Sequence, residues 1–241
     1  MTLTSLLVAD CVSKSYGARR VLSSATLRAD EGLLRVLFGR NGVGKSTLMG
    51  IAAGQIRPDG GIIHFDGQAL LSTHQTELAE QGLFYLSDRG VFSARYSIRT
   101  QLEMLRSQYR ASPIQSAVER LRLGSFLDSK PPRLSGGELR RAEFAAALVR
   151  APRCLLADEP LRGVSPKDAE ELLTILRELA IGGTAVVVSG HDVSSLLTAA
   201  DRVTWCTSGT TYELGSPDQA CRNETFRREY LGVWSTFHKS K

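Results

Sequence analysis

The chain has 241 residues, of which 42% are hydrophobic and 23% charged, and its formal net charge is +5. This composition is that of an ordinary globular protein with a proper core, which excludes disordered and fibrous classes. No apolar run approaches the roughly 20 residues that span a bilayer. The modest positive charge fits a well-solvated surface, an anionic membrane face or nucleic acid, so charge alone selects no partner.

The N-terminus and the cysteines bear on the cellular compartment. Met1–Asp10 has no charged region ahead of its short apolar patch, so no secretory signal is expected. The four cysteines, Cys11, Cys154, Cys206 and Cys221, are scattered without metal-ligand spacing. Reduced thiols in the cytoplasm are the simplest interpretation.

The first 38 residues are predicted to form short strands joined by turns, beginning with a strand at Leu6–Val12. Tyr16 follows this strand, just before a glycine. An aromatic side chain there could stack on an adenine ring, but a half-exposed turn tyrosine explains it equally well. The residue by itself does not decide between the two.

The next segment fits the phosphate-loop pattern of Gly, four residues, then Gly-Lys-Ser. Its residues are Gly39, Arg40, Asn41, Gly42, Val43, Gly44, Lys45, Ser46 and Thr47. The glycines let successive N–H groups turn towards phosphate oxygens, the lysine adds positive charge, and the serine hydroxyl can bind Mg²⁺. An apolar strand at 33–38 precedes the loop and a helix at 47–53 follows it, so phosphates would lie at a helix N-terminus. This context disfavours a glycine-rich turn that matches by chance.

Beyond this helix, turn signals at 57–61 and 66–67 enclose a strand, and residues 82–86 are predicted to form a buried strand. The pattern from about 97 to 126 is helical, with Pro113 expected in the first turn of its second helix.

A second anion-binding constellation follows at Leu134–Glu138. Ser135 suits an N-cap, and Gly136 and Gly137 would expose backbone N–H groups at the start of a helix predicted over 139–150. The alternative is an ordinary glycine-containing helix cap.

Acidic residues then end an apolar strand, because Asp158 and Glu159 come directly after Cys154–Ala157. Carboxylates at a strand end suit magnesium binding and water activation. After a helix at 166–179, another buried strand at 184–189 leads to His191. This alternation of strands and helices predicts a mainly parallel sheet wound with helices.

In this order, the phosphate loop, Leu134–Glu138, the Asp158–Glu159 pair and His191 resemble the ATP-binding subunits of ABC transporters over essentially the entire chain. The Leu-Ser-Gly-Gly-Glu element is the most specific part, since other phosphate-loop ATPases lack it. Within the family, segments 159–166 and 226–232 are similar to subunits that serve lipopolysaccharide export or branched-chain amino acid uptake.

The resemblance implies an α/β fold: a phosphate-loop NTPase (RecA-like) core of mainly parallel sheet, with an antiparallel β-subdomain and an α-helical signature subdomain. Residues 1–241 would form one ATP-binding domain. The helical subdomain is expected at roughly 89–150, and 233–241 is expected to be a flexible tail.

The same resemblance assigns roles to matching residues. Tyr16 would stack on adenine, and residues 39–47 would wrap the phosphates of ATP. Ser46 and Asp158 would hold Mg²⁺, Asp158 through water. Glu159 would act as general base, and His191 would contact the γ-phosphate and stabilise charge in the transition state. Lys45 would add positive charge at the phosphates.

Ser135, Gly136 and Gly137 would bind the nucleotide of a second copy, which implies a head-to-tail homodimer around two Mg-ATP. The expected function is the ATP-hydrolysing motor of an ABC transporter, held on the cytoplasmic face of the inner membrane by membrane-spanning subunits. Helices from about 97 to 110 would receive those subunits. Nucleic acid is not an expected partner.

Two positions depart from the family pattern. A glutamine that normally touches magnesium is replaced by Asp88, which could still bind the metal but, when ionised, donates no hydrogen bond. An aspartate that normally precedes Pro166 is replaced by Ser165. Both changes concern communication between parts of the assembly. They suggest one alternative, a weakly active regulatory or nucleotide-sensing subunit. A soluble assembly ATPase of the same family also stays open.

Overall fold

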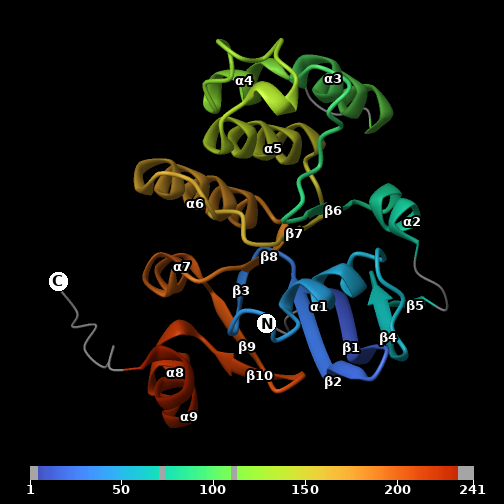
Figure 1. Ribbon diagram of the computed structural model, residues 1–241, viewed down its shortest axis with the longest axis vertical. Helices are drawn as coiled ribbons and strands as arrows, with labels where there is room; N and C mark the ends of the chain where they lie inside the picture. Colours follow the sequence, from blue (N-terminus) through green and yellow to red (C-terminus); the bar gives the residue numbers. More distant parts are fainter. Residues whose placement is uncertain (1–4, 71–73, 110–112, 233–241) are drawn as a thin grey trace.

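The structure is a computed structural model that describes residues 5–70, 74–109 and 113–232. The strands in these ranges form a ten-stranded sheet in the order β5-β4-β1-β2-β10-β9-β3-β8-β7-β6, with helices on both sides (Figure 1). The strands are β1 Ser5–Tyr16, β2 Arg19–Asp30, β3 Leu34–Phe38, β4 Gly60–Phe65, β5 Gln68–Leu70, β6 Leu83–Leu86, β7 Cys154–Ala157, β8 Ala185–Ser189, β9 Arg202–Thr207 and β10 Thr210–Gly215. The helices are α1 Lys45–Ala52, α2 Gln75–Glu80, α3 Ile98–Tyr109, α4 Gln115–Arg120, η1 Pro131–Arg133, α5 Gly136–Arg150, α6 Pro166–Ile181, α7 Val193–Ala199, α8 Pro217–Arg222, α9 Glu224–Phe226 and η2 Arg227–Leu231.

The parallel part of the sheet consists of β9, β3, β8, β7 and β6 in adjacent pairs. Every residue of β8 is buried, and its side chains alternate between two cores. Val186 and Val188 face the core built with α5 and α6, whereas Val187 faces the core built with α1. A strand buried on both faces needs an unbroken apolar sequence. This is why the sequence pattern predicts the buried strand at 184–189.

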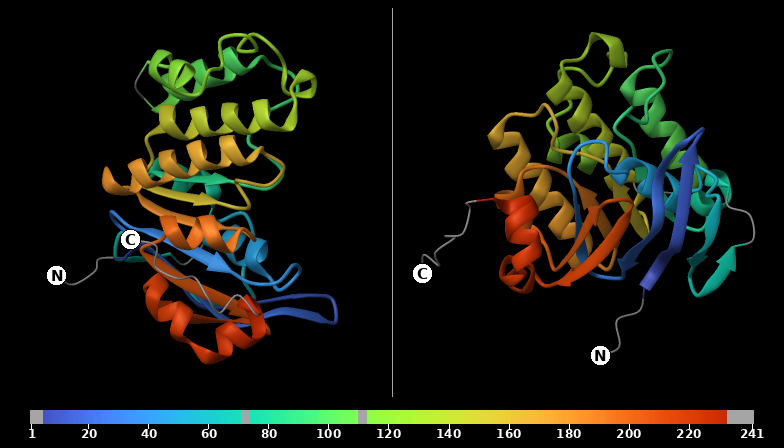
Figure 2. Two further views of the ribbon diagram at one scale, coloured as in Figure 1. Left: turned by 90° about the vertical axis from the view of Figure 1, so that its left-hand side faces the viewer. Right: turned by 60° about the horizontal axis from the view of Figure 1, so that its bottom comes forward.

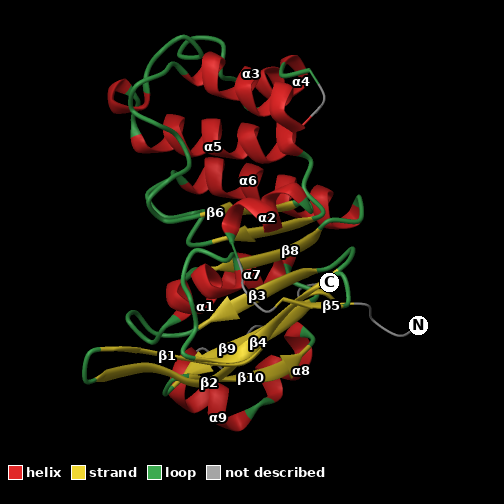
Figure 3. Ribbon diagram, turned by 90° about the vertical axis from the view of Figure 1, so that its right-hand side faces the viewer, coloured by secondary structure: helices red, strands yellow, loops and turns green. Residues whose placement is uncertain are grey.

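The strands β1, β2, β4 and β5 form an antiparallel part at one end of the sheet. In it β1 pairs with both β2 and β4, and β4 pairs with β5. Figure 3 shows the long β1–β2 hairpin reaching past the end of the other strands. The predicted fold class, a mainly parallel core with antiparallel and helical parts, is confirmed. The antiparallel strands do not form a separate layer, because β2 pairs with β10 and joins the two parts.

The helices α3, α4 and α5 lie together at the end of the molecule furthest from the β1–β2 hairpin (Figure 1). The helix α5 contacts both α6, which runs alongside it (Figure 2), and strand β6 of the sheet. No helix in the described part of the chain is long and apolar enough to cross a membrane.

Two helix starts differ from the sequence expectation. α5 begins at Gly136 rather than at Leu139, because Ser135 and Glu138 form a reciprocal capping box that allows the glycines to join the first turn. Pro113 precedes the N-cap residue Ile114 of α4 and does not lie in its first turn. At α5 the cap, rather than the apolar periodicity, sets the boundary.

A buried ion pair fixes the junction of the two parts of the sheet. Arg35 of β3 is 3% exposed and donates to Asp30 at 2.6 Å and to Thr204 at 2.9 Å, and it also pairs with Glu213 of β10. We expect Arg35→Ala to lower the free energy of unfolding by about 3–5 kcal/mol, because it leaves the Asp30 carboxylate buried without a cation. Urea denaturation measures the change.

The matched control is Arg99→Ala, which removes an exposed arginine paired with Asp128 at 2.6 Å. Solvent screens that pair, so the midpoint of unfolding should stay at the parental value. A parental midpoint for Arg35→Ala would contradict the structural role of the buried pair.

Candidate active site

The segment from Gly39 to Gly44 joins β3 to α1, the strand–loop–helix arrangement predicted for it. A Cβ atom at Gly39 would lie 2.5 Å from the carbonyl oxygen of Cys206, and one at Gly44 would lie 2.7 Å from Leu22 Cδ2. Gly44 also has φ of 114°, a backbone conformation that side chains disfavour. Glycine is therefore required at both ends of the loop, by close packing as well as by conformation.

Lys45 begins α1 and is only 5% exposed. Its Nζ donates to the carbonyl oxygens of Gly39 at 2.7 Å and Arg40 at 3.3 Å. Burial lowers the pKa of Lys45, and the charges of Glu159 and Asp158 oppose that shift. No side chain caps the N-terminus of α1, where Ser46 lies exposed in the first turn. The loop thus offers backbone N–H groups and one ammonium group to an anion.

The two predicted acids follow β7 as expected, but their surroundings differ. Asp158 is fully buried, and its Oδ1 accepts from Ser189 Oγ at 2.5 Å. The hydroxyl of Tyr85 donates to Asp158 Oδ2 at 3.5 Å. Glu159 is half-buried and its Oε1 lies 2.8 Å from His191 Nε2. The structure therefore brings Lys45, Asp158, Glu159 and His191 to one end of the parallel strands.

A cavity of about 500 Å³ opens at this end of the sheet. Its walls include Asn41 from the phosphate loop, Glu159 and His191. Arg162, which is largely exposed, also lines it and places Nη1 3.8 Å from Glu159 Oε2. The cavity is thus polar and mixed in charge, with a carboxylate between a histidine and an arginine.

Tyr16 ends β1 and is 50% exposed. It pairs with Arg19 across the hairpin, and Arg19 donates to the carbonyl oxygen of Gly42 at 3.4 Å. The Nζ of Lys14 lies 5.7 Å from the centre of the Tyr16 ring. The hairpin is therefore attached to the phosphate loop and presents an accessible aromatic face beside it.

The segment Ser135–Gly137 is not part of this cavity. It starts α5, which Figure 1 shows on the opposite side of α6 from the α1 helix. The Ser135 side chain is engaged with Glu138 in the capping box. One chain therefore does not bring its two anion-binding segments together.

Asp88 lies exposed in the loop that follows β6. Burial, followed by the charges of Asp158 and Asp88, raises the pKa of the Tyr85 hydroxyl. Further along the loop, a Cβ atom at Gly90 would lie 2.5 Å from Glu143 Oε1. Glu143 is 2% exposed and lies 2.9 Å from Arg140 in the same helix, α5. The loop carrying Asp88 thus packs against the helix that Ser135 caps.

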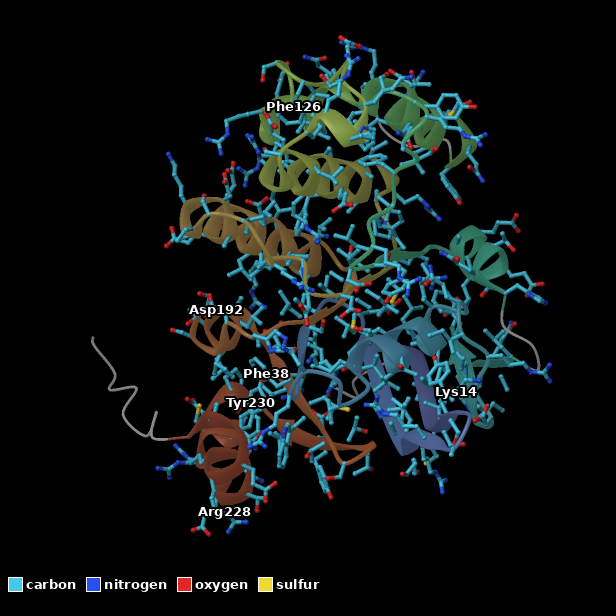
Figure 4. The ribbon with its side chains drawn as sticks, viewed as in Figure 1. Lys14, Phe38, Phe126, Asp192, Arg228 and Tyr230 are labelled. Atoms are coloured by element: carbon cyan, nitrogen blue, oxygen red, sulfur yellow. The ribbon has the colours of Figure 1, made fainter. Side chains whose placement is uncertain are left out.

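The C-terminal segment also touches the phosphate loop, which sequence reasoning did not detect. Arg40 donates to the carbonyl oxygen of Glu229 at 2.9 Å. Tyr230 packs with Phe38 at 5.6 Å between ring centres, and both are marked in Figure 4. The expected tail at 233–241 lies outside the described residues.

The comparisons with known proteins agree with this geometry. The family described as ABC transporter matches residues 22–162. The chain belongs to the ABC transporter family. It is 30% identical over 235 residues to the lipopolysaccharide export system ATP-binding protein LptB of Haemophilus influenzae, covering 95% of this chain and 98% of that one. It is 32% identical to LptB of Acidithiobacillus ferridurans, with the same coverage of both chains.

The solved structures of ABC cassettes show the same fold. A nucleotide-free ATP-binding cassette has a TM-score of 0.81 at 21% identity and covers 95% of this chain and 100% of that chain. A dimeric cassette in a post-hydrolysis state, bound to ADP and phosphate, has a TM-score of 0.75 at 24% identity and covers 86% and 98% of the two chains. The chain is therefore an ABC-type ATPase, the ATP-binding subunit of a transporter.

Gly39 gives a direct test of the phosphate loop. We expect Gly39→Ala to weaken binding of a fluorescent ATP analogue by about tenfold or more, the effect of roughly 1.4 kcal/mol, because its Cβ would push the loop away from the Cys206 carbonyl. Gly124→Ala is the matched control, since an added Cβ there meets open space. Parental affinity in Gly39→Ala would contradict the packing argument.

Proposed function

We propose that this ABC subunit binds Mg-ATP with residues 39–47 and works as a head-to-tail homodimer that drives membrane-spanning partner subunits. One observation carries the proposal. The cavity is lined by Asn41 of the phosphate loop, by Glu159 and by His191, whereas Ser135–Gly137 lie elsewhere on the chain. A second copy can supply the absent segment, and the dimeric cassette among the similar structures supports this arrangement.

The donor set suits magnesium, a hard cation that prefers oxygen ligands and keeps several waters. Ser46 would supply a hydroxyl and Asp158 a buried carboxylate acting through water, with Asp88 at the edge of the site. The ion would neutralise charge on the phosphates. Lys45 would exchange its loop carbonyl partners for phosphate oxygens. Their negative charge would compensate the cost of burying the Lys45 ammonium group.

The proposed chemistry assigns Glu159 as general base. Its carboxylate lies at the cavity wall beside His191, where it would hold a water against a bound phosphate. His191 would contact the γ-phosphate and stabilise charge as it develops. Tyr16 would stack on adenine, since its exposed ring stands next to the phosphate loop through Arg19.

Coupling to membrane-spanning subunits would use the groove beside the Asp88 loop. This groove of about 290 Å³ lies between α2, β6 and α3 and is lined by Ala79, Phe84, Val91 and Tyr109. A short apolar helix of a partner would press there on the loop that packs against Glu143 of α5.

We propose residues 89–150 as the helical subdomain of a single domain, 1–241, held at the cytoplasmic face of the inner membrane by these partners.

A second candidate is a soluble assembly ATPase of the same family, or a weakly active regulatory subunit. Asp88 and Ser165 favour the regulatory subunit, since both depart from the family pattern, and Ser165 instead caps α6 by accepting from the Asp168 N–H at 3.2 Å. Co-purification of the tagged chain with a polytopic membrane protein supports the transporter. Full ATPase activity without any membrane partner supports the assembly enzyme.

The Glu159→Gln variant tests hydrolysis. We expect the ATPase rate to fall by about 10²–10⁴-fold, the usual contribution of a general base, while ATP affinity is kept because glutamine has the same shape. The variant should also form an ATP-dependent dimer that light scattering detects. Glu170→Gln, an exposed position on α6, is the control. An unchanged rate in Glu159→Gln would disprove the assignment.

The Asp88→Gln variant tests the departure from the family pattern. The amide restores a hydrogen-bond donor and removes a negative charge from the loop after β6. We expect ATP affinity to stay the same, while the ATPase rate or its dependence on the membrane partner changes by more than about twofold, a shift of roughly 0.4 kcal/mol. Asp218→Gln on the exposed face of α8 serves as control. No change in rate or partner dependence counts against a role in coupling.

A further inference from the structure

Ser189 is the last residue of β8 and is completely buried. Its hydroxyl oxygen accepts the backbone N–H of Glu159 at 2.9 Å, and it donates to Asp158 Oδ1 at 2.5 Å. The direction of these bonds is fixed, because an amide N–H can only donate and a hydroxyl has a single proton. Ser189 therefore contacts both acids of the site at once.

The position of this hydroxyl follows from where the sheet ends. The ladder between β7 and β8 stops at Ala157, which pairs with Val188. The Glu159 N–H lies beyond that ladder, and the Ser189 side chain provides its acceptor. The next strand along, β3, pairs Leu37 with Ser189 and leads into the phosphate loop. Ser189 therefore ends the strand β8, which lies between β7, the strand before the acids, and β3, the strand before the phosphate loop.

Glu159 needs such an anchor because its backbone is in the left-handed region, with φ of 48°. A non-glycine residue holds this conformation only where its surroundings fix it. The turn directs the Glu159 carboxylate to His191, two residues after Ser189. Gly190 between them allows close packing, since a Cβ there would lie 2.6 Å from Leu196 Cδ1.

We infer that Ser189 is a positioning residue for ATP hydrolysis, which orients the metal-binding carboxylate of Asp158 and the general base Glu159 through one hydroxyl. This inference rests on the proposed roles of those two acids. Groups that hydrogen-bond a metal ligand hold it in the binding orientation, and their loss typically costs 10–100-fold in metal affinity or activity. Tyr85 contacts only the other Asp158 oxygen, and at a longer distance of 3.5 Å.

The test compares Ser189→Ala, Ser189→Thr and Tyr85→Phe. We expect Ser189→Ala to lower kcat by about 10- to 100-fold and to lose most of the increase in affinity for a non-hydrolysable ATP analogue that Mg²⁺ gives over EDTA. Affinity in EDTA should stay at the parental value. Ser189→Thr keeps the hydroxyl and should restore both quantities. Tyr85→Phe should weaken the Mg²⁺ effect with a smaller loss of kcat, because it leaves the Glu159 backbone contact in place.

Thr184→Val is the structural control, since Thr184 has a buried hydroxyl just before the other end of β8 that donates to the Pro152 carbonyl oxygen at 3.0 Å. Parental kcat and Mg²⁺ dependence in Ser189→Ala would overturn the inference. Equal losses in Ser189→Ala and Thr184→Val, tracking a lower melting temperature and not rescued by threonine, would also overturn it. Equal kcat losses in Ser189→Ala and Tyr85→Phe would overturn the part of the inference that concerns Glu159, because Tyr85→Phe leaves the bond from Ser189 to the Glu159 backbone in place.

The Mg²⁺-dependent affinity separates this inference from the proposed function. If the parental chain does not hydrolyse ATP, the proposed function fails, but the affinity measurement still reports whether Ser189 orients Asp158. If the parental chain hydrolyses ATP and Ser189→Ala does so equally well, only the role of Ser189 fails.

Discussion

Lys45 and Asp158 carry opposite charges, and both are buried at the end of the sheet where β3 leads into the phosphate loop and β7 into the acids, with β8 between these two strands. A buried charge is costly unless it is paired and hydrogen-bonded. Lys45 donates to a carbonyl oxygen of the phosphate loop, and Asp158 accepts hydrogen bonds from two hydroxyl groups. The position of the phosphate loop relative to the acids is therefore fixed by the sheet rather than by the loops alone.

The same sheet explains how distant parts of the chain can respond to the site. The loop after β6 begins beside Tyr85 and Asp158 and packs against Glu143 of α5. Ser135, in the segment proposed to reach a second copy, caps the start of that helix. In the proposed dimer, a shift at the acids would pass to the second copy through this loop and α5, past the groove proposed for a membrane partner. Asp88 lies on this route.

The sheet core and the phosphate loop were readable from sequence because each depends on local rules. Buried strands need apolar residues on both faces, and the loop needs glycine at positions where a Cβ has no room. Helix starts were less readable, since the Ser135–Glu138 box moved the start of α5 ahead of its apolar pattern. Tyr85 and Ser189 were included in predicted strands, and no sequence signal showed that their hydroxyls meet one carboxylate.

Residue type and spacing along short segments were enough to predict the fold class and the family, and to nominate the residues that would bind phosphate. Which residues lie in contact depends on the tertiary structure. It places the Ser189 hydroxyl against both acids and the Glu229 carbonyl oxygen against Arg40 of the phosphate loop, across separations of 30 residues or more. It also kept Ser135–Gly137 away from that loop. The Ser189 contacts follow from the pairing of β8 with β3 and β7. Which distant strands pair is a property of the whole sheet.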